Sequence, residues 1–515
     1  MRPISLALLA PVVAVALSAS ACTGGGGGET PEPERDVTSA GTLDWKTCGR
    51  PTPEQGGDGK APARLADGTR WECATLEVPL DYAKPGGKRI GIALIKAGAK
   101  DPGRRLGSLV YNFGGPGGSG VLILPELAKD YEKLRERWDL VGFDPRGVGA
   151  SAPVTCLDDA RIDEERGVDA IPDNAAEEKE VQLMTREQVQ GCQSRAGDLL
   201  PYVTTTNTAR DLDRIREALG DKRLNYFGIS YGTQLGGVYA HLFPKRVGRT
   251  VLDAVVDPTK GGVDSARAQA KGFELALTDY MRDCAAQEAG DCPTGTGGAA
   301  GRDRLLAFLD GLESEPLPTA DGRELTATDA VLGIAAALYS EESWPYLTQA
   351  LQEAEQGRGD VLMALADFYL DRDDKGHYAN STSSGTAITC ADTTERFTIP
   401  QARARAAEFA REAPVFGPLL GWSLLTCTDW PLDGESAHPE VSAPGAAPIL
   451  VIGNTGDPAT PYEGAGHMAD ELGVGVELTY HGEGHGAYGQ SDCVDDAVNG
   501  LLLTGKVPAA GTECR

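Results

Sequence analysis

Short apolar runs alternate with segments of helical periodicity through the first half of the chain. Two early segments alternate between apolar and polar residues, which is typical of paired antiparallel strands, and four later runs are mainly apolar, which is typical of buried strands. The predicted strands are 71–82, 89–96, 107–113, 138–143, 224–227 and 249–257. Residues 208–220 have helical spacing and stop at a glycine. Strands that alternate with helices predict a mostly parallel sheet covered by helices.

The pattern changes in the region from residue 262 to residue 435, where the periodicity is helical and strand-like runs are few. The helical segments there are 272–284, 304–312, 327–339, 345–356 and 401–412. Strand character returns at 447–453 and 476–480. We therefore expect an α/β core whose sheet is interrupted by a large helical cap. The predicted division is a first core segment at 41–261, the cap at 262–435 and a C-terminal core segment at 436–515.

The N-terminus has the pattern of an export signal. A positive Arg2, an apolar stretch and small residues before Cys22 predict a signal peptide at 1–21. The position of Cys22 resembles a bacterial lipobox, which would make it the lipidated N-terminus, and plain secretion is the alternative. Residues 22–40 are rich in Gly, Pro and Glu and predict a flexible tether. We expect an exported protein that meets a membrane only through its N-terminal lipid.

Composition narrows the possible partners. The 515 residues are 41% hydrophobic and 24% charged, which is globular, and exceed one ordinary core. The formal net charge of −28 argues against nucleic acid or anionic membrane surfaces as partners. The simpler interpretation of that charge is a soluble, self-repelling surface.

Ten cysteines remain after Cys22, an even number in an exported chain. Ten cysteines allow on the order of a thousand pairings, so sequence alone does not fix the pattern. We predict that successive neighbours pair, as Cys48/Cys73, Cys156/Cys192, Cys284/Cys292, Cys390/Cys427 and Cys493/Cys514. None has the clustered spacing of a metal site, and we expect neither a metal nor another cofactor.

The candidate chemistry centres on a G-x-S-x-G motif at residues 228–232. An apolar strand enters it and a small-residue helix leaves it, which is the strand–turn–helix context of a nucleophile elbow, with Ser230 as the nucleophile. A second glycine-rich loop, residues 114–120, follows another predicted strand. Since Pro116 has no N–H, Gly115 is the expected donor there, and together with the N–H of Tyr231 it would form an oxyanion hole.

A nucleophilic serine needs a base and an acid later in the chain. Of six histidines, His485 lies between glycines after the last strand and is the predicted base, while His481 lies closer to the strand and is expected to be structural. Asp457, in the turn after the preceding strand, is the predicted acid that orients His485. Arg146 is either a substrate ligand or, as we expect, a brace for loops beside the site.

The chain resembles the secreted α/β-hydrolase serine peptidases of the tripeptidyl aminopeptidase and proline iminopeptidase type. The matching stretches are CATLEVPLDY, NFGGPGGSG, DPRGVGAS, YFGISYGTQLG, VLDAVVDP, AITCADT, GNTGDPATP, GHG and the C-terminal pair of cysteines. The resemblance implies an α/β-hydrolase fold, a mostly parallel sheet covered by helices with a helical cap inserted before the last strands. It also implies the triad Ser230, Asp457 and His485, with Gly115 and Tyr231 as oxyanion donors.

The favoured function is an exported serine exopeptidase that removes tripeptides or single residues from peptide N-termini. The alternatives are a carboxylesterase on small esters and a catalytically silent peptide-binding lipoprotein. An exopeptidase must bind the substrate's free ammonium group, which needs a nearby carboxylate. Asp392 is the first candidate and Glu395 the second; the alternative is that Asp392 caps a short helix that begins there.

Overall fold

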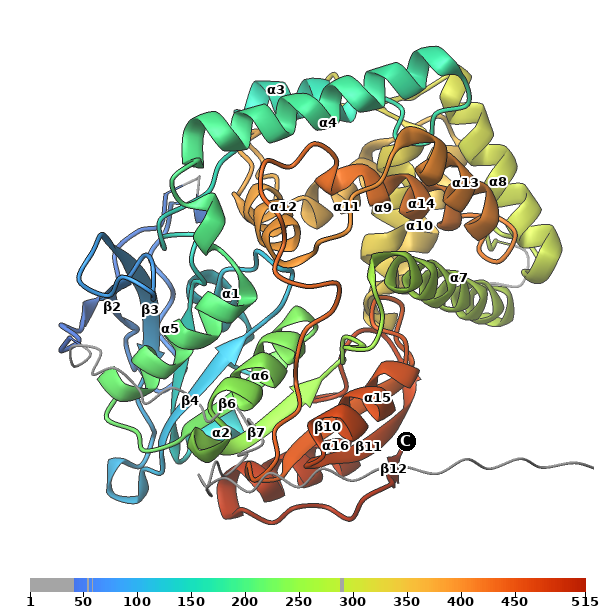
Figure 1. Ribbon diagram of the computed structural model, residues 1–515. Coiled ribbons are helices and arrows are strands. Elements are labelled where there is room, and N and C mark those ends of the chain that lie inside the picture. The colour runs from blue at the N-terminus through green and yellow to red at the C-terminus, as the bar shows by residue number, and fades with distance from the viewer. Residues whose placement is uncertain (1–40, 53–54, 58, 288–290) are drawn as a thin grey trace, which may run out of the picture. The chain divides into compact units, whose positions relative to one another are not determined.

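A mostly parallel sheet of ten strands forms the centre of the described part of the chain (Figure 1). The computed structural model describes residues 41–52, 55–57, 59–287 and 291–515; the predicted signal peptide, Cys22 and the tether lie outside them. The strands of this sheet are β1 (Lys46–Thr47), β2 (Glu72–Pro79), β3 (Arg89–Ala97), β4 (Gly107–Asn112), β5 (Trp138–Phe143), β6 (Leu224–Ile229), β7 (Val247–Asp253), β10 (Ile449–Gly456), β11 (Gly475–Glu483) and β12 (Thr512–Cys514).

The spatial order of the strands is β1-β2-β3-β5-β4-β6-β7-β10-β11-β12. The strands from β5 to β12 in that order pair in parallel, whereas β1, β2 and β3 are antiparallel and β3 joins β5 antiparallel. Parallel strands end at the same edge of a sheet, so the loops that follow β4, β6, β7 and β10 converge there. The predicted strand at 249–257 is too long, because β7 ends at Asp253 and the next residue, Ala254, turns the chain with a φ of +57°.

Helices cover both faces of the sheet, as the alternation of strands and helices predicts. Side chains of α5 (Thr205–Ala218), α6 (Tyr231–Leu242) and α15 (Glu463–Leu472) share a buried cluster with Val110 and Val451. Side chains of α1 (Gly120–Leu127), α2 (Glu132–Arg135) and α16 (Asp492–Asn499) share another with Leu109 and Ile452. Neighbouring strand residues thus enter opposite layers, which fixes the register of the central strands.

The helical cap lies between β7 and β10 in the chain, as expected. Its helices are α7 (Gly262–Gln287), α8 (Gly298–Ser314), α9 (Ala327–Leu338), α10 (Trp344–Glu355), α11 (Asp360–Tyr369), α12 (Ser381–Asp392), α13 (Ile399–Phe409) and α14 (Gly417–Trp422), with a short hairpin of β8 (Leu317–Pro318) and β9 (Glu324–Leu325). Side chains of α7 to α11 form a buried cluster of their own. The cap therefore has an independent apolar core beside that of the sheet.

Two helices from the first core segment also pack against the cap. These are α3 (Asp159–Arg166) and α4 (Ala175–Ala196), and Figure 1 shows α4 running along the top of the cap helices. Val181 of α4 shares a buried cluster with Ala402 and Trp422. Arg166, at the end of α3, binds the carboxylate of Asp329 at 2.8 Å. The cap is thus assembled from two stretches of the chain, of which the insertion is the larger.

Five disulfides join the cysteines that were predicted to pair, Cys48–Cys73, Cys156–Cys192, Cys284–Cys292, Cys390–Cys427 and Cys493–Cys514. Each closes a local segment of between 8 and 37 residues.

Arg146 is a brace, as expected. Its guanidinium is fully buried and binds both carboxylate oxygens of Asp211, at 2.6 and 2.7 Å. It also donates to the main-chain oxygens of Leu80 and Tyr202. All of these partners belong to the core, so Arg146 ties the loop after β5 to its surroundings and is not free to hold a substrate.

Candidate active site

Ser230 lies in a strained turn between β6 and α6. Its φ is +57° and its ψ is −128°, a conformation that non-glycine residues adopt only when the surroundings impose it. A Cβ on Gly232 would lie 2.5 Å from the main-chain oxygen of Asn112, and one on Gly228 would lie 2.3 Å from that of Gly232. Only glycine fits at either position, so the motif is required by the close approach of strand, turn and helix. The predicted strand–turn–helix geometry is confirmed.

The glycine-rich loop after β4 lies directly against Ser230. Gly114 and Gly115 have φ values of +95° and +107°, and a Cβ on Gly114 would lie 2.7 Å from the Cβ of Ser230. The far end of the loop is fixed by Asp144, whose carboxylate accepts hydrogen bonds from the Ser119 hydroxyl at 2.6 Å and the Val121 N–H at 3.1 Å. A loop held at both ends beside the serine is suited to present its N–H groups to an oxyanion.

Asp457 is buried and pairs with His485, which is partly buried. The Nδ1 of His485 lies 2.9 and 3.0 Å from the two carboxylate oxygens of Asp457. That carboxylate also accepts hydrogen bonds from the N–H groups of Ala459 and Thr460, each at 2.9 Å. Burial lowers the pKa of His485, but the charge and the hydrogen bond of Asp457 outweigh it, so that the pKa lies above its ordinary value. Asp457 therefore stabilises the protonated form of the His485 imidazole.

Ser230 opens into a cavity of about 830 Å³ that Gly115, Tyr231, Tyr339 and Thr460 also line. His485 stands at its margin: its ring meets the Tyr339 ring edge-on, with centroids 5.2 Å apart, and its Nδ1 lies 3.4 Å from the Thr460 hydroxyl. The main-chain oxygen of Tyr339 accepts the N–H of His485 at 2.8 Å. The serine turn, the glycine-rich loop and the acid turn thus line one cavity, and the histidine loop lies beside it.

Two other histidines have partners away from Ser230. His481 is exposed and lies 3.5 Å from the carboxylate of Glu513 near the C-terminus. His467, on α15, binds the carboxylate of Asp257 at 2.7 Å.

Asp392 and Glu395 both line the cavity, but each also binds the N-terminus of a helix. One oxygen of Asp392 accepts the Thr205 N–H at 2.8 Å at the start of α5, and the other accepts the Thr205 hydroxyl at 2.6 Å. Glu395 accepts the N–H of Gly262, the first residue of α7. The predicted cap of a helix beginning at Asp392 is wrong: α12 ends there, and the carboxylate caps a helix distant in sequence.

Sequence reasoning missed a chain of hydrogen bonds from Asp392 to the residue after the nucleophile. The Thr205 hydroxyl, which donates to Asp392, lies 2.6 Å from the phenol oxygen of Tyr231. Burial raises the pKa of Asp392 to about 7, although the two hydrogen bonds from Thr205 lower it. Motif matching gives no signal for this contact, because Thr205 and Asp392 are 187 residues apart.

Two further carboxylates also escaped the sequence analysis. Glu435, at the exit from the cap, lines the cavity, and its N–H pairs with the main-chain oxygen of Ala391. Within the described ranges, its carboxylate has no hydrogen bond or ion pair. Asp253, at the end of β7, accepts hydrogen bonds from the histidine loop. The only signal for Asp253 in the sequence is an acidic residue within an apolar run. The strand predicted at 249–257 continues past this residue, so the pattern did not mark it as the end of the strand.

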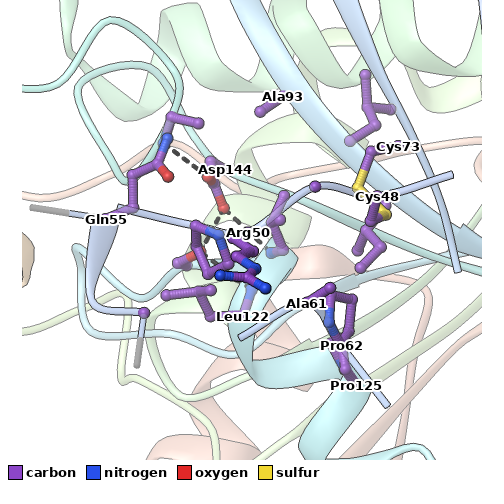
Figure 2. A pocket seen from close by; sticks show the side chains of 18 of the residues that line it. Cys48, Arg50, Gln55, Ala61, Pro62, Cys73, Ala93, Leu122, Pro125 and Asp144 are labelled. Carbon is purple, nitrogen blue, oxygen red and sulfur yellow. Dashed lines mark hydrogen bonds between the residues drawn. A yellow bond between two sulfur atoms is a disulfide. The ribbon is translucent and has the colours of Figure 1, made fainter. Parts of the chain in front are cut away.

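A second cavity, of about 870 Å³, lies between the N-terminal segment and α1 and shares no lining residue with the first (Figure 2). Arg50, Gln55 and Asp144 are among its lining residues. Burial raises the pKa of Asp144 to about 6, and its hydrogen bonds with Ala150, Ser119 and Val121 offset part of that rise. Its lining includes the Cys48–Cys73 disulfide but none of the predicted catalytic, oxyanion-hole or ammonium-binding residues.

The fold and the site together define a serine hydrolase of the α/β-hydrolase class. Residues 413–514 match the model of a family described as TAP-like protein. The chain is 40% identical over 457 residues to "Serine protease Hip1" of Mycobacterium tuberculosis, covering 86% of this chain and 87% of the relative. It is 36% identical over 458 residues to "Carboxylesterase B" of the same species, covering 86% of each, and 32% identical over 481 residues to "Tripeptidyl aminopeptidase" of Streptomyces lividans, covering 92% and 86%.

These similarities cover between 86% and 92% of the chain. The chain belongs to the family of tripeptidyl aminopeptidase-like α/β-hydrolases, as the sequence motifs indicated.

Proposed function

We propose that the protein is an exported serine exopeptidase that releases short units, tripeptides or single residues, from peptide N-termini. The observation that supports it most is the composition of the cavity at Ser230, where Asp392, Glu395 and Glu435 all line the wall. Carboxylates in a half-enclosed space favour a cationic group such as a peptide's N-terminal ammonium. The relatives named serine protease and tripeptidyl aminopeptidase support the same substrate class.

The proposed mechanism assigns a role to each part of the site. His485 takes the proton from the Ser230 hydroxyl as its oxygen attacks the scissile carbonyl, and Asp457 stabilises the imidazolium. The N–H groups of Gly115 and Tyr231 donate hydrogen bonds to the developing oxyanion. His485 then gives its proton to the leaving amine, whose loss leaves an acyl-enzyme. A water molecule, activated in turn by His485, attacks the acyl carbon and restores the free serine.

For the ammonium site we propose Glu435 beside the two residues expected from the sequence. Asp392 and Glu395 already accept hydrogen bonds from helix N-termini, so their remaining capacity for a substrate is limited. The free carboxylate of Glu435 lines the same cavity, and its negative charge also acts on Asp392. A substrate ammonium placed there would neutralise this cluster of like charges.

Hydrolysis of small esters is the second candidate, because the same machinery attacks an ester and one relative is named Carboxylesterase B. A catalytically silent peptide-binding protein is the third.

Five disulfides support export to an oxidising compartment. Within the described residues, no helix is long and apolar enough to cross a membrane. We propose that attachment, if the protein is anchored, is through a lipid on Cys22, and that short peptides or small esters are its partners, with no nucleic acid.

The test begins with fluorophosphonate labelling of wild type and Ser230→Ala. Hydrolysis is then measured on a tripeptidyl coumarin amide with a free amine, its N-acetylated form and a p-nitrophenyl ester. An exopeptidase cleaves the free-amine peptide best; ester turnover without peptide turnover would identify a carboxylesterase. A protein that is folded yet neither labelled nor active would be the silent binding protein.

Glu435→Gln tests the ammonium site. Losing one charge-assisted contact should lower kcat/KM on the free-amine peptide by roughly 10- to 100-fold and leave the ester unchanged. Asp433→Asn, an exposed neighbour that does not line the cavity, is the matched control and should change neither. An equal loss on both substrates would show that Glu435 does not bind the amine.

A further inference from the structure

Asp253 forms hydrogen bonds with both the serine turn and the histidine loop. It is the last residue of β7 and is only 2% exposed. Its main-chain oxygen accepts the N–H of Ser230 at 3.1 Å. Its carboxylate accepts the N–H of Ala487 at 3.1 Å from each oxygen and the N–H of Tyr488 at 3.0 Å, two and three residues after His485 in the chain. One residue therefore links the serine turn directly to the histidine loop.

Burying a carboxylate to make this link costs free energy of folding, because the charged group loses its hydration. Burial raises the pKa of Asp253, and the nearby charge of Asp457 raises it further, while the N–H bonds of Tyr488 and Ala487 lower it. Within the described ranges, no ion pair of Asp253 with Lys or Arg offsets the burial. Accepting two N–H groups needs only a neutral oxygen, such as that of an amide. The choice of a charged group indicates a role for its charge.

The nearest positive charge that could form is on His485. The groups in contact with its ring include the Asp457 carboxylate, the Thr460 hydroxyl and the Tyr339 ring from the cap, and the charge of Asp253 also acts on it. The charge of Asp253 also acts on the phenol of Tyr131, which is neutral at working pH because burial raises its pKa. An anion at Asp253 therefore acts chiefly on the imidazole and favours its protonated form.

We propose that Asp253 is a positioning residue that holds the histidine loop in register with the serine turn and stabilises the imidazolium of His485 during the reaction. The inference rests on the proposed function, because it takes Ser230 as the nucleophile and His485 as the base. It adds to that function a second buried carboxylate that acts through the base without touching the substrate.

The experiment measures the rate at which a fluorophosphonate labels the serine as a function of pH, in the full chain with its disulfides. Asp253→Asn and Asp253→Ser both remove the charge. If one of the two variants does not fold, the other still tests the proposal. Removing a nearby negative charge destabilises the imidazolium, so the midpoint of the acidic limb should move to lower pH by roughly half a unit. The maximal rate should fall about tenfold, because the transition state carries the same imidazolium.

Asp221→Asn is the matched control. Asp221 is another partly buried carboxylate whose pKa burial raises, and it accepts the N–H of Ser108 at 3.0 Å at the start of β4, the opposite end of the parallel sheet from the site. The Asp221→Asn change should lower the melting temperature of the protein without moving the midpoint of the acidic limb of the labelling rate. An unchanged midpoint in the Asp253 variants would overturn the inference and leave Asp253 a structural residue. Failure of wild type to be labelled at all would instead refute the proposed function.

Discussion

Replacing Thr205 by valine should weaken the contact between cap and core in a way that depends on pH. Valine keeps the shape of the side chain and the N–H that donates to Asp392 at 2.8 Å. It removes the hydroxyl that lies 2.6 Å both from Asp392 and from the phenol of Tyr231. Thr205 and Tyr231 are 3% and 5% exposed, so water does not readily replace the lost partner of the phenol.

The size of the effect follows from which groups lose a partner. A buried phenol left without a hydrogen bond costs about 1–3 kcal/mol, and the partly accessible carboxylate of Asp392 adds about 1 kcal/mol. Thr205→Val should therefore destabilise the protein by about 2–4 kcal/mol. In the double variant with Tyr231→Phe the stranded phenol is gone, so the combined loss should fall short of the sum by about 1–2 kcal/mol.

The dependence on pH follows from the protonation of Asp392. Its pKa is about 7 in the folded protein, above its ordinary value, so this group makes folding less favourable as the pH rises from about 4 to about 7. The Thr205 hydrogen bonds favour the ionised carboxylate and limit that loss. Without the hydroxyl the loss is larger, so Thr205→Val should cost more at pH 8 than at pH 5.

The assay is urea unfolding followed by tryptophan fluorescence at pH 5 and pH 8, with the disulfides intact. Thr205→Ser, which keeps the hydroxyl, is the matched control and should stay close to wild type. The reasoning fails if valine and serine unfold at the same urea concentration. It also fails if the valine and phenylalanine changes are simply additive, because the phenol would then have had no partner to lose.

Two further predictions test the assigned chemistry and the covalent framework. Ser230→Ala should abolish hydrolysis with the fold intact, and His485→Ala should lower kcat by several orders of magnitude, whereas the exposed His481→Ala should remain near wild type; a larger loss at His481 would reassign the base. Replacing Cys493 and Cys514 by alanine opens a loop of 21 residues and should lower the free energy of unfolding by about 3 kcal/mol, measured by chemical denaturation, with kcat nearly unchanged if the link is purely structural.

The sheet could be predicted because each parallel strand is a short apolar run bounded by turn residues. β5 begins and ends where the apolar run at 138–143 does, and the serine turn follows β6 as the glycines required. The end of β7 could not be predicted, since Val255 and Val256 continue the apolar pattern after Ala254 has turned the chain. Hydrophobicity marks burial, and a buried loop has the same signal as a buried strand.

The site could be predicted where chain order fixes it and not where distant segments meet. Asp457 and His485 follow successive strands of a parallel sheet, so their order alone brings them to one edge. Asp392 lines the cavity, but the helix that it binds is α5 and not one that begins at Asp392, because its partner Thr205 is distant in the sequence. Glu435 belongs to no motif, and only the folded cap brings it to the cavity wall.

Hydrogen bonds join the cap both to the proposed base and to a segment beside the serine. The main-chain oxygen of Tyr339 holds the N–H of His485, and the carboxylate of Asp392 holds Thr205, which in turn binds Tyr231. A cap that swung away as a rigid lid would break both contacts and leave the base and an oxyanion donor less well fixed. In the proposed mechanism, binding of the substrate at the cap and activation of the serine by the core are therefore coupled, because Tyr339 and Asp392 line the cavity and also make these contacts.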